Sequence, residues 1–153
     1  MNDSEIRRLV AALETNKVLE EEKAWLRLKP LGPAVLPYFL EAYPKMKKWQ
    51  GRVSLVFHST RYGRTHQEAF ELGIKALNDK ATLVRYRACE LLAYSLRKNA
   101  IPLLEELLKH EDQKTVEDAK AAIDAIRHQN HNYFRDRHHS DSIFWTVNAG
   151  DNA

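Results

Sequence analysis

One segment of the sequence, residues 42–67, combines positive charge with aromatic and imidazole side chains. It contains no Asp or Glu, and its rings include Trp49, His58, Tyr62 and His66. Cations interleaved with rings suit phosphate groups, single-stranded nucleic acid or an acidic protein surface, through charge attraction and stacking. The alternative is a solvated basic end of the fold, with Trp49 in the core. From this segment we assign six cations and one tyrosine to binding: Lys45, Lys47, Lys48, Arg52, Arg61, Tyr62 and Arg64.

The histidine-rich stretch after residue 127 is a second set of side chains that could bind a metal or take part in chemistry. His128 and His131 could share one face of a helix at a spacing that suits a metal ion. No carboxylate completes a recognised metal-binding spacing, and imidazoles near a helix C-terminus are also favoured by the helix dipole. The sequence therefore predicts no metal site and no cofactor, although His138 and His139 follow in the same stretch.

Patterns that indicate catalysis are missing from the sequence. His139, Ser140 and Asp141 are adjacent, so they cannot converge from separate elements as a catalytic triad requires. No glycine-rich phosphate loop, zinc-protease helix or paired CxxC motif occurs. Cys89 lies on the flank of a predicted helix and is expected to be a packed thiol. We therefore expect that the chain is not an enzyme.

The elements that carry these residues are predicted to be helices, because apolar residues recur at helical spacing throughout. A first helix begins after Asp3 or Ser4, and further helices are predicted at 17–28, 33–43, 47–60, 66–78, 81–97, 99–110 and 113–129. No convincing strand precedes residue 142. The fold class is therefore all-α, with a helical repeat domain over 1–130 and a C-terminal tail over 131–153.

The helical phase predicts which residues face the core and which face a partner. In helix 81–97, Leu91 belongs to the core stripe, as Leu104 does in helix 99–110. In helix 47–60, the residues assigned to the core stripe are Trp49, Val53, Val56, Phe57 and Thr60. The residues of helix 81–97 assigned to an outward, partner-binding side are Tyr86, Glu90 and Arg97.

The stretch from Leu77 to Ile126 contains an internal repeat. Asp79 and Asp112 lie 33 positions apart, each in a turn between a leucine-rich helix and a helix that contains valine. A period of that size is typical of stacked helical hairpins. A further match places Pro37 and Pro102 in the first turn of a helix, where proline costs little because that N–H has no helical partner.

These residues resemble the repeat of the HEAT family, in which proline stands early in the first helix and a Val-Arg pair opens the second. Pro102, Asp79, Val84 and Arg85 occupy the matching places. The resemblance implies a short right-handed α-solenoid of about four stacked hairpins, stabilised by a contact between Asp79 and Arg85. Proteins of this kind include scaffolds, inhibitors, toxin-neutralising proteins, bilin lyases and an alkylpurine DNA glycosylase.

The tail contains a short apolar segment, residues 142–147, with Ile143, Phe144, Trp145 and Val147. Leaving all four side chains in water would be costly. We expect the segment to fold back over the last hairpin as a cap, because the ends of repeat proteins need covering. The alternative is that it docks onto a partner.

Composition limits the location of the chain. A net charge of +3 and 44% hydrophobic residues are ordinary for a globular domain. The single cysteine fits a reducing compartment, and neither a leader-like N-terminus nor an apolar run of about 18 residues occurs. We therefore expect a cytoplasmic protein without a membrane contact.

These observations favour a non-catalytic module that binds an acidic protein, such as a bacterial adaptor or a toxin-neutralising immunity protein. The alternative is a nucleic-acid-binding protein that uses the basic segment 45–64. A DNA glycosylase or lyase related to the HEAT-like enzymes is the least favoured reading, because no acid can be assigned beside an aromatic cleft.

Overall fold

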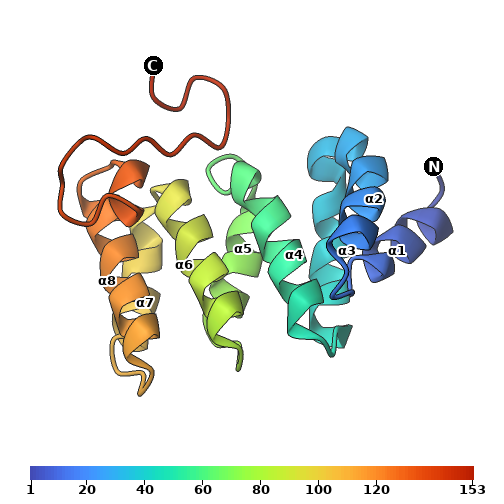
Figure 1. Ribbon diagram of the computed structural model, residues 1–153, viewed down its shortest axis with the longest axis horizontal. Coiled ribbons are helices and arrows are strands. Elements are labelled where there is room, and N and C mark those ends of the chain that lie inside the picture. Colours follow the sequence, from blue (N-terminus) through green and yellow to red (C-terminus); the bar gives the residue numbers. More distant parts are fainter.

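The computed structural model describes residues 1–153 and contains helices and no β-strand, which confirms the all-α prediction (Figure 1). None of its helices has the length and apolar character needed to span a bilayer. The α-helices are α1 (Asp3–Ala12), α2 (Val18–Leu28), α3 (Leu36–Ala42), α4 (Trp49–Ser59), α5 (Gln67–Ala76), α6 (Thr82–Ser95), α7 (Ile101–Leu107) and α8 (Gln113–Arg127). The 3-10 helices are η1 (Lys29–Val35), η2 (Tyr43–Lys45), η3 (Thr60–Tyr62), η4 (Lys98–Ala100) and η5 (His131–Phe134).

Local sequence signals set the ends of several helices. Pro37 and Pro102 stand in the first turns of α3 and α7, as predicted. The Asp112 side chain caps α8 by accepting a hydrogen bond from the backbone N–H of Lys114. Leu96, with φ of 58°, ends α6 in the left-handed conformation. The predicted helices therefore agree with the observed ones to within a few residues.

The helices lie in two rows. Neighbours in sequence contact one another in α1 and α2, α5 and α6, and α7 and α8. Contacts also join α4, α6 and α8 in one row, with α5 and α7 behind them (Figure 1). Since α6 has neighbours on several sides, its buried residues extend around most of its circumference. Leu91 in α6 and Leu104 in α7 are fully buried, as predicted.

Helix α5 approaches α6 very closely at Gly73. A Cβ atom at this position would lie 2.8 Å from Cδ2 of Leu91 and 3.1 Å from Cδ2 of Leu92. Both distances are below ordinary contact, so a larger residue at position 73 would require the Leu91 and Leu92 side chains to shift.

The turn aspartates join successive helix pairs. The expected contact between Asp79 and Arg85 is made through the Asp79 backbone oxygen, to which Arg85 Nη1 donates at 2.8 Å. The Asp79 carboxylate accepts from Arg52 of α4 at 2.7 Å and 3.1 Å, and from the N–H of Ala81. Arg85 Nη2 in turn donates to Asp112 at 3.1 Å. The carboxylates of Asp79 and Asp112 instead bind Arg52 and Arg85, each 27 positions earlier in the sequence.

The rotation of α4 about its axis is the main difference from the sequence prediction. Trp49 and Phe57, expected in the core, are 44% and 46% exposed. Arg52, expected to be free for binding, is buried by its ion pair with Asp79. Gly51 faces the interior, where a Cβ would lie 2.7 Å from Met46 Sδ and 3.0 Å from Glu14 Cα. The close packing at Gly51 and the ion pair of Arg52 require the side of α4 that carries these two residues to face inward.

The tail crosses the ends of α8 and α6 and reaches η3 (Figure 1). Trp145 is 4% exposed and packs against Tyr94, His131 and Phe134. Phe144 remains 74% exposed, so the segment is buried mainly through one ring. The tail reaches beyond the last hairpin, since Asn148 Nδ2 donates a hydrogen bond to the backbone oxygen of Arg61 in η3 at 2.8 Å.

Candidate functional site: a binding groove

Two adjoining hollows form a groove between the first helix pairs and the tail. They share Trp25, Phe57 and His58. We call the first the tail hollow; its volume is about 470 Å³ and its lining is Trp25, Lys29, Phe57, His58, Thr60, Arg61, Glu90, Arg135, Trp145, Thr146 and Val147. We call the second the N-terminal hollow; its volume is about 560 Å³, and it extends over Val18, Glu21, Trp49, Val53 and Arg87.

The wall shared by the two hollows is held by Glu21. The His58 ring stacks on Trp25 with centroids 3.8 Å apart and an angle of 11° between the planes. Glu21 lies 3.0 Å from His58 Nε2 and accepts from the Ser54 hydroxyl at 2.6 Å. The hydrogen bond with His58, reinforced by that from Ser54, lowers the pKa of Glu21. These contacts therefore hold the Trp25 and His58 rings in place.

A buried carboxylate, Glu90, organises the cationic part of the groove. Glu90 is 1% exposed, and its oxygens accept from Arg87 at 3.0 Å and from Arg135 at 3.2 Å. The Arg87 guanidinium lies over the Phe57 ring at 4.7 Å, and that of Arg135 over Trp145 at 4.8 Å. Cations above aromatic faces are attracted by the ring quadrupole. Glu90 therefore positions two arginine–aromatic pairs along the groove, and its predicted role as an exposed contact was wrong.

The same arrangement recurs around Asp118 on α8. This carboxylate is 2% exposed and binds Lys114 at 3.0 Å and Arg137 at 3.1 Å. Lys114 lies 4.6 Å from the Tyr86 ring, and Arg137 lies 5.1 Å from the Phe134 ring. Tyr86 is therefore half-buried beneath cations, and little of its ring is free for a partner.

The basic segment predicted from the sequence does not form one patch. Lys45, Lys47 and Lys48 are exposed just before α4, whereas Arg61 follows its last turn. Eleven helical residues separate the two groups, which at 1.5 Å per residue is about 16 Å. Arg52, between them, is buried. Only Arg61 of the predicted basic residues lines the tail hollow.

Arg64, Tyr62 and Arg97 also have structural partners. Arg64 donates to the backbone oxygen of Tyr94 at 2.7 Å and lies 3.6 Å from the carboxylate of Asp151, so it supports the tail. Tyr62 is partly buried in an edge contact with His66. Arg97 donates to Gln67 at 2.7 Å and lines neither hollow.

The sequence reasoning missed most of the residues that line the groove. Phe57 was assigned to the core face of its helix, Trp25 was not assigned to a site, and Arg135 and Trp145 come from the tail. One signal was available: α4 carries aromatic residues on one side and Gly51, Ser54 and Ser59 on the other. Small residues on one side of a helix can mark close packing as readily as solvent exposure. Comparisons with protein-family models and with curated proteins give no match for this chain.

Proposed function

We propose that the chain is a short right-handed α-solenoid of the HEAT-like kind that binds another protein and catalyses no reaction. The repeated arginine–aspartate pairs support the solenoid. The Arg52–Asp79 pair and the Arg85–Asp112 pair are related by 33 positions, and both pairs are hydrogen-bonded. An adaptor and a toxin-neutralising immunity protein would both work by such binding. The buried Cys89 thiol agrees with a cytoplasmic location.

The groove carries the proposal. Phe57 is nearly half exposed and forms a continuous surface with Trp25 in both hollows. Aromatic and arginine side chains are the residues that most often dominate binding energy at protein interfaces. Their orientation is fixed by Glu21 and Glu90, which reduces the entropy lost on binding.

The charge of the tail hollow favours an acidic partner segment. Its charged residues are the three cations Lys29, Arg61 and Arg135 and the single carboxylate Glu90. Glu90 is already engaged by two arginines, so Lys29 and Arg61 are left to attract a negative side chain. Such positive charges speed the encounter with an acidic partner, and added salt weakens this attraction.

A photo-crosslinking experiment tests the groove. A benzophenone amino acid replaces Phe57 in one variant and Leu103 of α7 in the control; both wild-type residues are between 40% and 50% exposed. In cells that make the chain naturally, we expect a defined protein adduct from position 57 and none from position 103. Reversal of Lys29 and Arg61 to Glu should reduce the adduct. Adducts of equal yield from both positions, or none from 57, would contradict the proposal.

Association and dissociation rates measured with the captured partner distinguish electrostatic steering from direct contact in the groove. Lys29→Glu with Arg61→Glu should chiefly slow association, and Phe57→Ala should chiefly speed dissociation. Reversal of Lys45 and Lys47, which line neither hollow, is the matched charge control.

Single-stranded nucleic acid is the second candidate ligand, because stacked rings beside cations can also hold bases and phosphates. Titration of the chain with a fluorescent single-stranded oligonucleotide across salt concentrations distinguishes it. A steep decrease of affinity with salt, together with nuclease-sensitive adducts at position 57, would favour nucleic acid over protein.

A further inference from the structure

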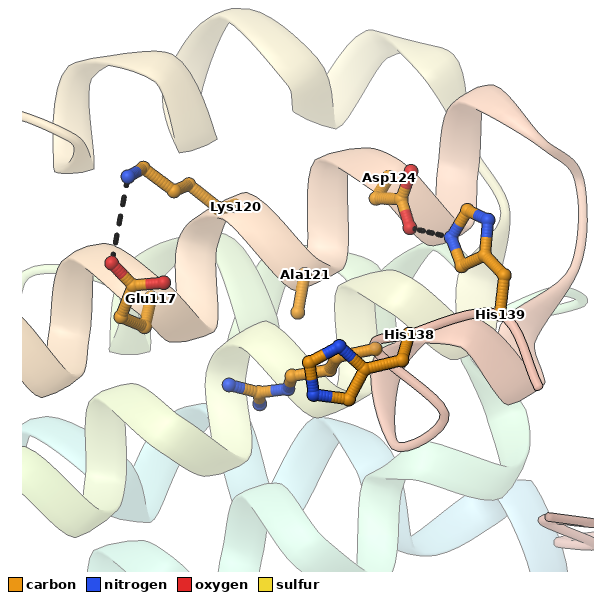
Figure 2. A pocket seen from close by; sticks show the side chains of 7 residues that line it. Glu117, Lys120, Ala121, Asp124, His138 and His139 are labelled. Atoms are coloured by element: carbon orange, nitrogen blue, oxygen red, sulfur yellow. Dashed lines mark hydrogen bonds and ion pairs between the residues drawn. The ribbon is translucent and has the colours of Figure 1, made fainter.

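Three side chains with metal-binding atoms meet where the tail contacts α8. They are Asp124 of α8, His128 directly after its last residue and His139 of the tail, and one ligand atom from each lies within 4.8 Å of those of the other two. Asp124 and His128 are one helical turn apart, so they lie on the same face of α8. Figure 2 shows His139 pointing at Asp124, whereas His138 points away from it.

A tight turn brings His139 to this place. His139 and Asp141 have φ of 54° and 60°, a region that non-glycine residues rarely adopt. The turn is closed by Asp136, which is 3% exposed and accepts from the N–H groups of Ser140 and Asp141 at 3.0 Å and 2.7 Å. Rare backbone angles that a buried group maintains cluster at binding sites.

The ring of His139 is fixed as well. Tyr133 stacks on it with centroids 3.8 Å apart and 10° between the planes. His128 contacts both rings edge-on, with its centroid 5.0 Å from that of His139. The imidazole of His139 is thus oriented by its neighbours, and its Nε2 atom faces the Asp124 carboxylate.

We propose that Asp124, His128 and His139 bind a zinc ion. Two imidazole nitrogens and one carboxylate oxygen are ligands that zinc prefers, at about 2.0–2.1 Å, with tetrahedral geometry. Asp124 and His139 also line an open hollow with Glu117, Lys120 and His138, through which water or a ligand atom could reach a bound ion. The nearby cations do not oppose binding, because Lys120 is paired with Glu117 and Arg137 with Asp118.

The site differs from the histidine pair suggested by the sequence. His131 is buried, with Nδ1 3.0 Å from Arg64 and Nε2 bonded to the Trp145 backbone oxygen, so it has no free nitrogen. Asp124 takes its place one turn earlier in α8. The metal would join α8 to the tail, and this role stands independently of the proposed partner.

Metal titration of the full chain tests the site. With zinc chloride in a calorimeter we expect one equivalent to bind, and with cobalt chloride the intense visible absorption of a tetrahedral site. His128→Ala and His139→Ala should each weaken zinc binding by at least about tenfold, whereas His138→Ala, the adjacent control, should not change it. Zinc should also raise the melting temperature of the wild-type chain.

A second measurement does not depend on whether the variants fold. In nitrogen-detected histidine spectra of the wild-type chain, zinc should shift His128 and His139 and leave His66 and His110 unchanged. Absence of stoichiometric binding at tens of micromolar zinc, shifts spread over all histidines, or equal binding by the double variant His128→Ala/His139→Ala would overturn the proposal.

Discussion

Arg52 and Asp79 are 27 positions apart and are joined by two hydrogen bonds, of 2.7 Å and 3.1 Å, from one guanidinium to one carboxylate. Both side chains are less than 10% exposed. The same separation of 27 positions recurs between Arg85 and Asp112. Each arginine also donates to the backbone oxygen six positions before it, at Met46 and Asp79. Similar contacts therefore join Arg52 of α4 to the turn after α5, and Arg85 of α6 to the turn after α7.

Removing one partner of the Arg52–Asp79 pair should strongly destabilise the chain. Arg52→Ala leaves Asp79 buried without its main cation, which typically costs about 3–5 kcal/mol of unfolding free energy. The control is Arg7→Ala, which removes an exposed pair with Glu41 and should cost less than about 1 kcal/mol. Urea unfolding measures both. Similar losses for the two variants would contradict the structural role of the buried pair.

Asp112 should make stability depend on acid pH. The hydrogen bond from Thr115, with those from Arg85 and Thr82, lowers the pKa of Asp112 from 3.8 to about 2. Because the folded pKa is below the unfolded value, the stabilisation is full above about pH 4 and is lost as the pH falls toward 2.

Asp112→Asn tests this dependence by urea unfolding at pH 5.5 and pH 2.5. The variant should be less stable than the wild type at pH 5.5, and the difference should shrink at pH 2.5. Glu106→Gln, which alters an exposed pair with Lys109, is the control and should have little effect at either pH. A difference between Asp112→Asn and the wild type that is independent of pH would count against this explanation.

Trp145 should anchor the tail. Trp145→Ala removes a ring that is 4% exposed and should cost about 3–5 kcal/mol, as truncation of buried aromatic residues does. Phe144→Ala, at the preceding and 74% exposed position, should change stability by no more than about 0.5 kcal/mol. Thermal melting of both variants gives the comparison. If the two melt alike, the tail is not held through Trp145.

The cores of α6 and α7 should be equally sensitive. Leu91→Ala and Leu104→Ala each create a cavity at a fully buried position and should cost about 2–5 kcal/mol. Leu103→Ala, at a 44% exposed position beside Leu104, should cost about 0.5 kcal/mol or less. Losses below about 1 kcal/mol at Leu91 and Leu104 would show that these sites can collapse around the truncated side chain.

The parts of the fold that depend on local pattern were predictable from the sequence. Pro37 and Pro102 mark helix starts because proline is tolerated there in any tertiary setting. Leu104 lies in an apolar stripe at helical spacing, which predicts its burial. Leu91 lies on a helix that is buried around most of its circumference, so its burial does not depend on the helical phase.

The rotation of α4 could not be predicted in the same way. This helix has apolar residues on both sides, because Trp49 and Phe57 line the groove while Leu55 and Val56 are buried. Which side of α4 faces the interior depends on the ion pair of Arg52 with Asp79, 27 positions later in the sequence. A distant ion pair does not appear in the hydrophobic pattern of the helix.

Most of the groove and the proposed metal site also could not be predicted from the sequence, because their residues come from distant positions in the chain. Glu90 reads as a surface residue until Arg135, 45 positions later, pairs with it. His139 reaches Asp124 only through a turn whose residues adopt positive φ. No spacing rule for histidines contains that information.

The long reach of the tail has a consequence for biosynthesis. Contacts between neighbouring helices close short loops, whereas Asn148 meets Arg61 across 87 positions and Asp151 meets Tyr94 across 57. Since a chain emerges from the ribosome N-terminus first, the helices can pair while the tail hollow still lacks a wall. That hollow forms only after residues 145–151 have been released from the exit tunnel. A nascent chain therefore acquires its helical scaffold before the tail hollow is complete.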